Sequence, residues 1–193
     1  MRKIQPADIR PTPDYELDRN RVRSHLIDIK RDRRIAVGPN MTVLFENRDT
    51  MIYQIQEMMR VEKITDLAAI KHEITTYNEL VPEEDGLSAT ILLEYEDPAE
   101  RDVRLVALLG LENHVELRIE GHEPVAAEFD LRQMSPDRIS AVHYSKFTLG
   151  AERAGAVKAG AAVSLATTHT EMAVEVPFSD AQRGALVEDL SAE

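Results

Sequence analysis

The widest mixture of chemically capable side chains lies between Val43 and Arg60, in the run V-L-F-E-N-R-D-T-M-I-Y-Q-I-Q-E-M-M-R. Tyr53, Glu57 and Arg60 are separated by four and three residues, so a helix places them on one side. A carboxylate, a guanidinium and a phenol arranged in this way can hold a polar ligand when they are sheltered from water. The alternative is an ordinary solvated helix face, because exposed ion pairs contribute little to stability.

A second predicted helix adds polar groups to this set. It contains Glu73, Tyr77 and Asn78. The link between the two helices is short, which favours an antiparallel hairpin. The polar groups of both helices would then face each other. The sequence therefore predicts a polar pocket between this hairpin and the rest of the domain.

The six histidines form no recognised metal-binding motif. None follows an Asp or Glu by three residues, so the Glu-x-x-His pattern of di-iron bundles is absent, as is H-E-x-x-H. Two metal hypotheses stay open. One combines Glu57 and Glu62 with a histidine, and the other brings together histidines from neighbouring strands. The second would use His114, His122 and His143.

Basic residues are concentrated at the start of the chain. Residues 1–34 hold ten Lys/Arg and six Asp/Glu, a net charge of +4; the whole chain carries -12, so the remainder carries -16. An arginine-rich helix can bind phosphate or RNA, but no aromatic residue is interleaved with these arginines to stack on bases. The acidic remainder disfavours non-specific nucleic-acid binding. The basic residues of this helix are Arg19, Arg21, Arg23, Lys30, Arg31, Arg33 and Arg34.

Composition bounds the class of protein. A length of 193 residues fits a single domain. The absence of cysteine excludes disulfides and iron–sulfur ligation by this chain's own residues. No apolar run is long enough to span a membrane, and the opening M-R-K-I-Q-P-A-D-I lacks the apolar core of a signal peptide. We therefore expect a cytoplasmic protein.

The first half of the chain is predicted to be mainly helical. Residues 1–13 are proline-rich and extended, and Asp14 is expected to cap a helix that runs to Arg33. A strand over 41–45 precedes the two hairpin helices. Asn47 or Asp49 is expected to cap the first helix, the second starts near Thr65 or Asp66, and Pro82 ends it. These elements form a mainly helical part over residues 14–82.

The second half of the chain is predicted to be mainly β-structure, over residues 87–193. A strand over 87–95 is followed by a helix with Asp97 as N-cap and Gly110 at its end. Ser179 and Gln182 form the capping box of a C-terminal helix, and 150–160 is expected to be a loop. Period-two patterns predict further strands over 114–120, 125–129, 139–149, 161–167 and 172–176. Strands without intervening helices favour an antiparallel sheet. The fold class is α+β, with N-terminal helices, including the hairpin, packed against a C-terminal sheet.

The chain resembles a bacterial family known as domain of unknown function 3501. The resemblance is carried, in order along nearly the whole chain, by G-P-N-M-T-V-L-F-E-N-R-D-T-M-I-Y-Q-I-Q-E-M-M-R-V-E-K-I, Y-N-E-L-V-P, L-S-A-T, D-P-A-E-R, L-L-G-L-E-N-H-V and V-H-Y-S-K-F. The family often has a His-Pro-x-Tyr turn near its C-terminus, where this chain has His169-Thr170-Glu171-Met172. The family assigns no activity or cofactor to its members.

The resemblance selects a set of residues that we term the candidate polar face. It comprises Glu46, Asn47, Arg48, Tyr53, Gln54, Glu57, Arg60, Glu62, Tyr77, Asn78 and Arg101. Members of the family tend to be encoded beside rubrerythrin-like proteins and iron–sulfur oxidoreductases. This association implies an accessory or binding role in oxidative stress, with such a protein as partner. A metal-dependent enzyme and a phosphate or RNA binder are the alternatives.

Overall fold

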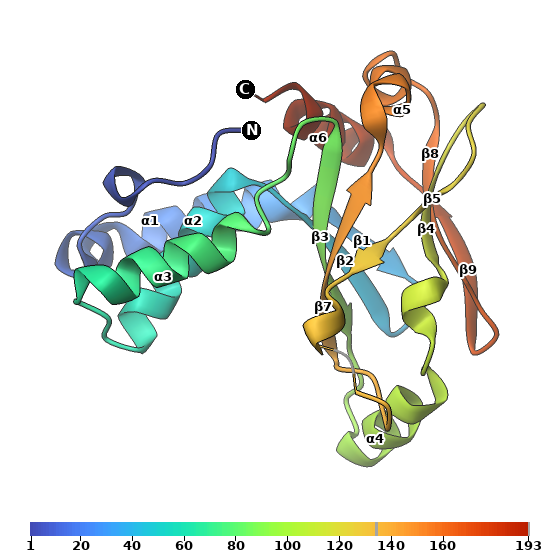
Figure 1. Cartoon of the computed structure of the whole chain (residues 1–193), viewed down its shortest axis with the longest axis horizontal. Helices are drawn as coiled ribbons and strands as arrows, with labels where there is room; N and C mark the ends of the chain where they lie inside the picture. The colour runs from blue at the N-terminus through green and yellow to red at the C-terminus, as the bar shows by residue number, and fades with distance from the viewer. Residues whose placement is uncertain (134, 193) are drawn as a thin grey trace.

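The structure is a computed structural model that describes residues 1–133 and 135–192. Figure 1 shows a group of N-terminal helices beside a body of β-sheets. The helices are α1 (Thr12–Arg31), α2 (Arg48–Val61), α3 (Leu67–Asn78), α4 (Pro98–Ala107), α5 (Gly150–Lys158) and α6 (Asp180–Ser191), with short 3₁₀ turns at Pro6–Asp8, Leu111–Asn113 and Leu131–Gln133. The strands are β1 (Arg34–Val37), β2 (Met41–Glu46), β3 (Gly86–Leu93), β4 (Val115–Ile119), β5 (Val125–Ala126), β6 (Glu128–Phe129), β7 (Val142–Thr148), β8 (Val163–His169) and β9 (Met172–Pro177).

The predicted α+β class is confirmed, and the strands form two antiparallel sheets. One sheet has the order β1-β2-β3-β7-β6 and the other β5-β4-β8-β9. Alternate residues of each strand point inward, as in β4, where Val115, Leu117 and Ile119 are buried. These residues pack in one core with inward residues of the first sheet such as Phe45 and Phe147. The two sheets therefore enclose a shared apolar core.

The helices α1, α2 and α3 form a helical lobe with a second apolar cluster of its own. Its centre contains Met51, Ile55 and Met59 of α2 and Ile74 of α3. The predicted strand-to-helix step is present, because β2 ends at Glu46 and α2 begins at Arg48. The helices α2 and α3 pack against each other, and Figure 1 shows the lobe projecting from one side of the sheets.

Helix ends follow the predicted capping chemistry in most cases. The Asn47 side chain accepts a hydrogen bond from the backbone N–H of Thr50 at the start of α2, and Asp66 and Asp97 cap α3 and α4. Gly110 adopts a left-handed conformation after α4, with φ of 93°. The cap at Asp14 was wrong: α1 begins at Thr12, because the fixed φ of Pro13 suits the first turn of a helix.

Three further expectations are corrected. Residues 150–158 form α5 rather than a loop, because Ala154 and Val157 give this short helix a buried side. The predicted strand 125–129 is two short strands, β5 and β6, in different sheets. The strand β1 (Arg34–Val37) was missed, since it follows α1 almost without a link. None of the helices in the described ranges has the length and apolar character needed to cross a bilayer.

Candidate functional site

Glu57 is the centre of an ion-pair network between α1 and α2. Its carboxylate accepts hydrogen bonds from the Tyr15 hydroxyl at 2.5 Å, from Arg19 Nε at 2.8 Å and Nη2 at 2.9 Å, and from Arg60 Nη2 at 3.1 Å. The side chain of Glu57 is only 16% exposed. Hydrogen bonds from Arg19 lower the pKa of Glu57 to about 2, with Tyr15 and Arg60 acting in the same direction and burial opposing them. Burial and the bond to this carboxylate raise the pKa of Tyr15.

The two tyrosines of the candidate polar face, Tyr53 on α2 and Tyr77 on α3, have partners inside the lobe. Tyr53 lies beneath Lys30 of α1, whose Nζ is 5.8 Å from the ring centroid. Tyr77 packs against the lobe cluster and is hydrogen-bonded to Gln54. Burial raises the pKa of Tyr77, and the bond from Gln54 opposes that shift. These groups join the helices to one another.

Two side-chain amides hold the segment that precedes α1. We call residues 2–10 the arm segment. Asn78 accepts from the backbone N–H of Ile4 at 2.8 Å and donates to its carbonyl at 2.9 Å. Gln56 does the same for Arg10, at 2.8 and 3.0 Å. Each amide therefore satisfies both backbone groups of one arm residue.

Charged groups reinforce this attachment. Arg48 forms an ion pair with Asp8 of the arm segment at 2.6 Å. The backbone N–H of Gln5 and the guanidinium of Arg48 lower the pKa of Asp8 to about 2. Lys3 donates at 2.9 Å each to the carbonyl of Asn78, the last residue of α3, and to the carbonyl of Val81 in the loop that follows. Arg48 and Asn78 thus bind the chain's own residues.

The end of β2 carries the two most buried members of the candidate polar face. Glu46 is 5% exposed, and its Oε1 accepts from the Thr90 hydroxyl at 2.6 Å. Its Oε2 has no partner among the described residues. Asn47 donates to Asp189 of α6 at 3.2 Å, and Asp189 also pairs with Arg33 at 2.9 Å. Asn47 therefore ties the lobe to the C-terminal helix.

Two members of the candidate polar face lie apart from the rest. Glu62 is exposed where α2 ends. Arg101 lies on α4, which follows the Leu93 end of β3, and Leu93 pairs with Met41 at the opposite end of β2 from Glu46. Figure 1 accordingly shows α4 away from the lobe. The structure does not bring Arg101 to the other members.

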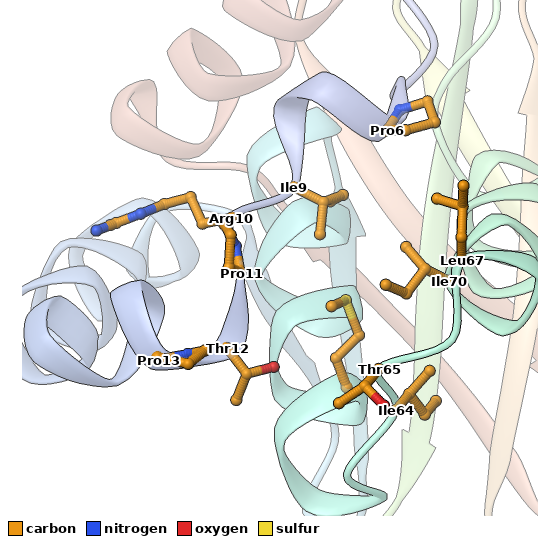
Figure 2. A pocket seen from close by; sticks show the side chains of 11 residues that line it. Pro6, Ile9, Arg10, Pro11, Thr12, Pro13, Ile64, Thr65, Leu67 and Ile70 are labelled. Carbon is orange, nitrogen blue, oxygen red and sulfur yellow. The ribbon is translucent and has the colours of Figure 1, made fainter.

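An apolar cavity of about 380 Å³ lies between residues 6–13 and the α2–α3 hairpin, and we call it the lobe groove. Figure 2 shows Ile9 of the arm segment pointing toward Leu67 and Ile70 of α3, whereas the Arg10 side chain points away. Leu67 is 57% exposed, although it is a large apolar residue. The groove is lined by Pro6, Ile9, Arg10, Pro11, Thr12, Pro13, Met59, Ile64, Thr65, Leu67 and Ile70.

The metal hypotheses gain no support from the geometry. Within residues 1–133 and 135–192, no group of three His, Cys, Asp or Glu side chains could hold a metal ion. His114 approaches His169, with ring centroids 5.3 Å apart, rather than His122. His143 points into the core beside Phe129. Glu57, proposed as a ligand, is instead surrounded by arginines.

Most arginines of α1 are paired with carboxylates, which weakens the phosphate or RNA hypothesis. Arg19 binds Glu57, Arg21 binds Asp18, and Arg31 binds Asp28 and Asp32. Arg33 is buried against Asp189. A phosphate would have to compete with these carboxylates for each guanidinium.

Sequence reasoning identified Glu57 and Arg60 but not their main partners. Tyr15 and Arg19 lie 42 and 38 residues from Glu57 along the chain. Their contact depends on how α1 packs on α2, which no local pattern encodes. Gln56 stands in the same run as Glu57, yet only the position of the arm segment shows what it binds.

Comparisons with known proteins place the chain beside proteins whose roles are not established. A family model described as "Protein of unknown function (DUF3501)" matches residues 3–190. A crystal structure of a "novel protein of unknown function" from Burkholderia pseudomallei K96243 is 30% identical and superimposes with a TM-score of 0.93. The alignment covers 98% of this chain and 100% of that one. No curated protein shows significant similarity to this chain.

Proposed function

The chain belongs to the DUF3501 family, and we propose that it is a non-catalytic binding protein that takes a partner at the lobe groove. One observation carries this proposal. Glu57 and Asn78 of the candidate polar face are engaged by other residues of the chain, whereas the lobe groove is lined mainly by apolar side chains. A cavity of this kind offers apolar area for binding but few groups for acid–base chemistry.

The partner class is part of the same proposal. We propose a rubrerythrin-like or iron–sulfur protein, and hence an accessory role in oxidative stress. This part rests on the family association described above. The absence of cysteine from the chain supports an accessory role over one as an electron carrier. A protein partner is also consistent with the exposed Leu67 at the mouth of the groove, because exposed apolar surface marks interaction sites.

Co-purification from the native host tests this proposal. We expect Leu67→Asp to lose the partner that wild-type protein retains, since it places a charge in the apolar groove. Val103→Asp is the matched control, because Val103 is 68% exposed on α4. It should retain the partner. Equal recovery of the partner with both variants would exclude the lobe groove as the binding surface.

A further inference from the structure

A second cavity, of about 210 Å³, lies between α1 and α2, and we call it the interhelical pocket. Asp49, Ile52 and Tyr53 of α2 line one wall, at positions i, i+3 and i+4, which share one side of a helix. Val22 and Leu26 of α1 line the other wall. The pocket therefore places a carboxylate beside aliphatic side chains.

The polar groups at one end of the interhelical pocket are used by the chain itself. Asp8, Arg10 and Gln56 line this end. The Gln56 amide binds the backbone N–H and carbonyl of Arg10. The Asp8 carboxylate pairs with Arg48, and the Arg10 guanidinium pairs with Asp18. These ion pairs balance the charges of Asp8 and Arg10, so neither charge is left for a ligand.

Three other polar groups that line the interhelical pocket are not used in this way. They are the Asp49 carboxylate, the His25 imidazole and the Tyr53 hydroxyl. None of the three forms a hydrogen bond or an ion pair within residues 1–133 and 135–192. Asp49 is therefore the uncompensated charge that faces the pocket, and that charge is negative.

The free charge and the lining together select a class of ligand. A carboxylate binds an ammonium group through charge-assisted hydrogen bonds, and it repels an anion. An ammonium group has three N–H donors, and Asp49, His25 and Tyr53 each supply an acceptor. The Tyr53 ring also attracts cations, as its contact with Lys30 shows. The pocket volume equals that of about seven water molecules at about 30 Å³ each, so the ligand is small.

We propose that the interhelical pocket binds a small organic cation, a primary amine on a compact apolar body. Asp49 holds the ammonium group, and the aliphatic wall of Val22, Leu26 and Ile52 contacts the apolar body. This inference does not depend on a partner at the lobe groove, because the two cavities have only Arg10 in common.

Titration of the full-length protein with benzylamine, followed by the NMR chemical shifts of backbone amides, tests this proposal. We expect saturable shifts in residues 22–26 and 49–53, which line the interhelical pocket, and no comparable shifts in residues 64–70 of the lobe groove. Benzyl alcohol has nearly the same shape without the positive charge. It should bind more weakly by about tenfold or more, because it makes no charge-assisted hydrogen bond to Asp49.

A pair of variants assigns the binding to Asp49. Asp49→Asn should weaken benzylamine binding by about tenfold or more, because it removes the free charge. Asp28→Asn is the matched control, since Asp28 is an exposed carboxylate of α1 that does not line the pocket. Its affinity should stay within about twofold of wild type, because exposed charges interact weakly at a distance.

The amide spectra of both variants also show that they are folded. Four results would overturn the proposal: no saturable binding of benzylamine, shifts confined to residues 64–70, equal affinity for benzyl alcohol, or an equal loss of affinity in the two variants.

Discussion

At the scale of single residues, the Glu57 carboxylate joins α2 to α1, because it accepts hydrogen bonds from Tyr15 and Arg19. The spacing of Tyr53, Glu57 and Arg60 correctly indicated one helix side. Tyr15 and Arg19 of α1, which bind the Glu57 carboxylate, lie far from it in the sequence. Such pairing follows from the packing of α1 on α2, and a single sequence contains no signal for it.

Removal of the Glu57 charge should destabilise the helical lobe. We expect Glu57→Gln to lower the free energy of unfolding by about 1–3 kcal/mol, because Arg19 and Arg60 lose a charged acceptor. Urea denaturation at pH 7 measures this change. Glu62→Gln, at an exposed position on the same helix end, should change it by less than about 0.5 kcal/mol.

The ion pairs of Glu57 should also make the free energy of unfolding depend on pH. The pKa of Glu57 is lowered to about 2 in the fold, from an ordinary value of 4.5. Its contribution to stability is therefore present above pH 4.5 and is lost as the pH falls toward 2. The difference in unfolding free energy between wild type and Glu57→Gln should shrink over that interval. A difference that stays constant from pH 6 to pH 3 would show that the charge does not carry the effect.

His143 should make the fold sensitive to mild acid. Burial lowers the pKa of His143, opposed by a backbone group of Ser140 and by Glu112. The neutral form is thus favoured in the fold, so stability should fall as the pH drops below 6.5, the ordinary value. We expect His143→Leu to lose less stability than wild type between pH 7.5 and pH 5, measured by denaturation at both values. An equal loss in both proteins would assign the acid sensitivity to other groups.

At the scale of elements, the capping residues at helix ends predicted the helices better than the periodicity of apolar residues did. Asp66, Asp97 and the Ser179–Gln182 capping box located the starts of α3, α4 and α6, because a side-chain oxygen at these positions has a local role. The helix α5 was missed because its sequence, G-A-E-R-A-G-A-V-K, has little apolar contrast. Its helical state depends on the burial of Ala154 and Val157 by the rest of the fold.

The helix α5 offers a direct test at this scale. Gly155 lies inside the helix, and a Cβ added there meets no atom within 4 Å. We expect Gly155→Ala to raise the free energy of unfolding by about 0.5–1 kcal/mol, because alanine restricts the unfolded chain. Gly160→Ala should be destabilising instead, since Gly160 has a φ of +99°. Thermal unfolding of both variants checks the opposite signs.

At the scale of the whole molecule, the buried apolar residues form two separate clusters. One apolar cluster lies between the two sheets, and a second lies inside the helical lobe. The α+β class could be predicted because helix and strand patterns were both recognisable and the consecutive strands indicated antiparallel pairing, as in β8 and β9. The division into two sheets could not, because β5 and β6 are two residues long and pair with strands of different sheets, β4 and β7.

We propose that the helical lobe offers the lobe groove to a partner. Its polar groups hold α1, α2, α3 and the arm segment together, and its apolar groove stays open. We therefore expect the partner to cover the lobe groove and to leave the ion-pair network around Glu57 unchanged.

Hydrogen–deuterium exchange on the complex purified from the native host tests that claim most directly. Compared with the free protein, the complex should show slower exchange in the segments that line the lobe groove, residues 6–13 and 59–70. The strands β4, β8 and β9 and the helix α4 should exchange at unchanged rates. Protection confined to α4 or to the second sheet, with no change in residues 59–70, would contradict the account.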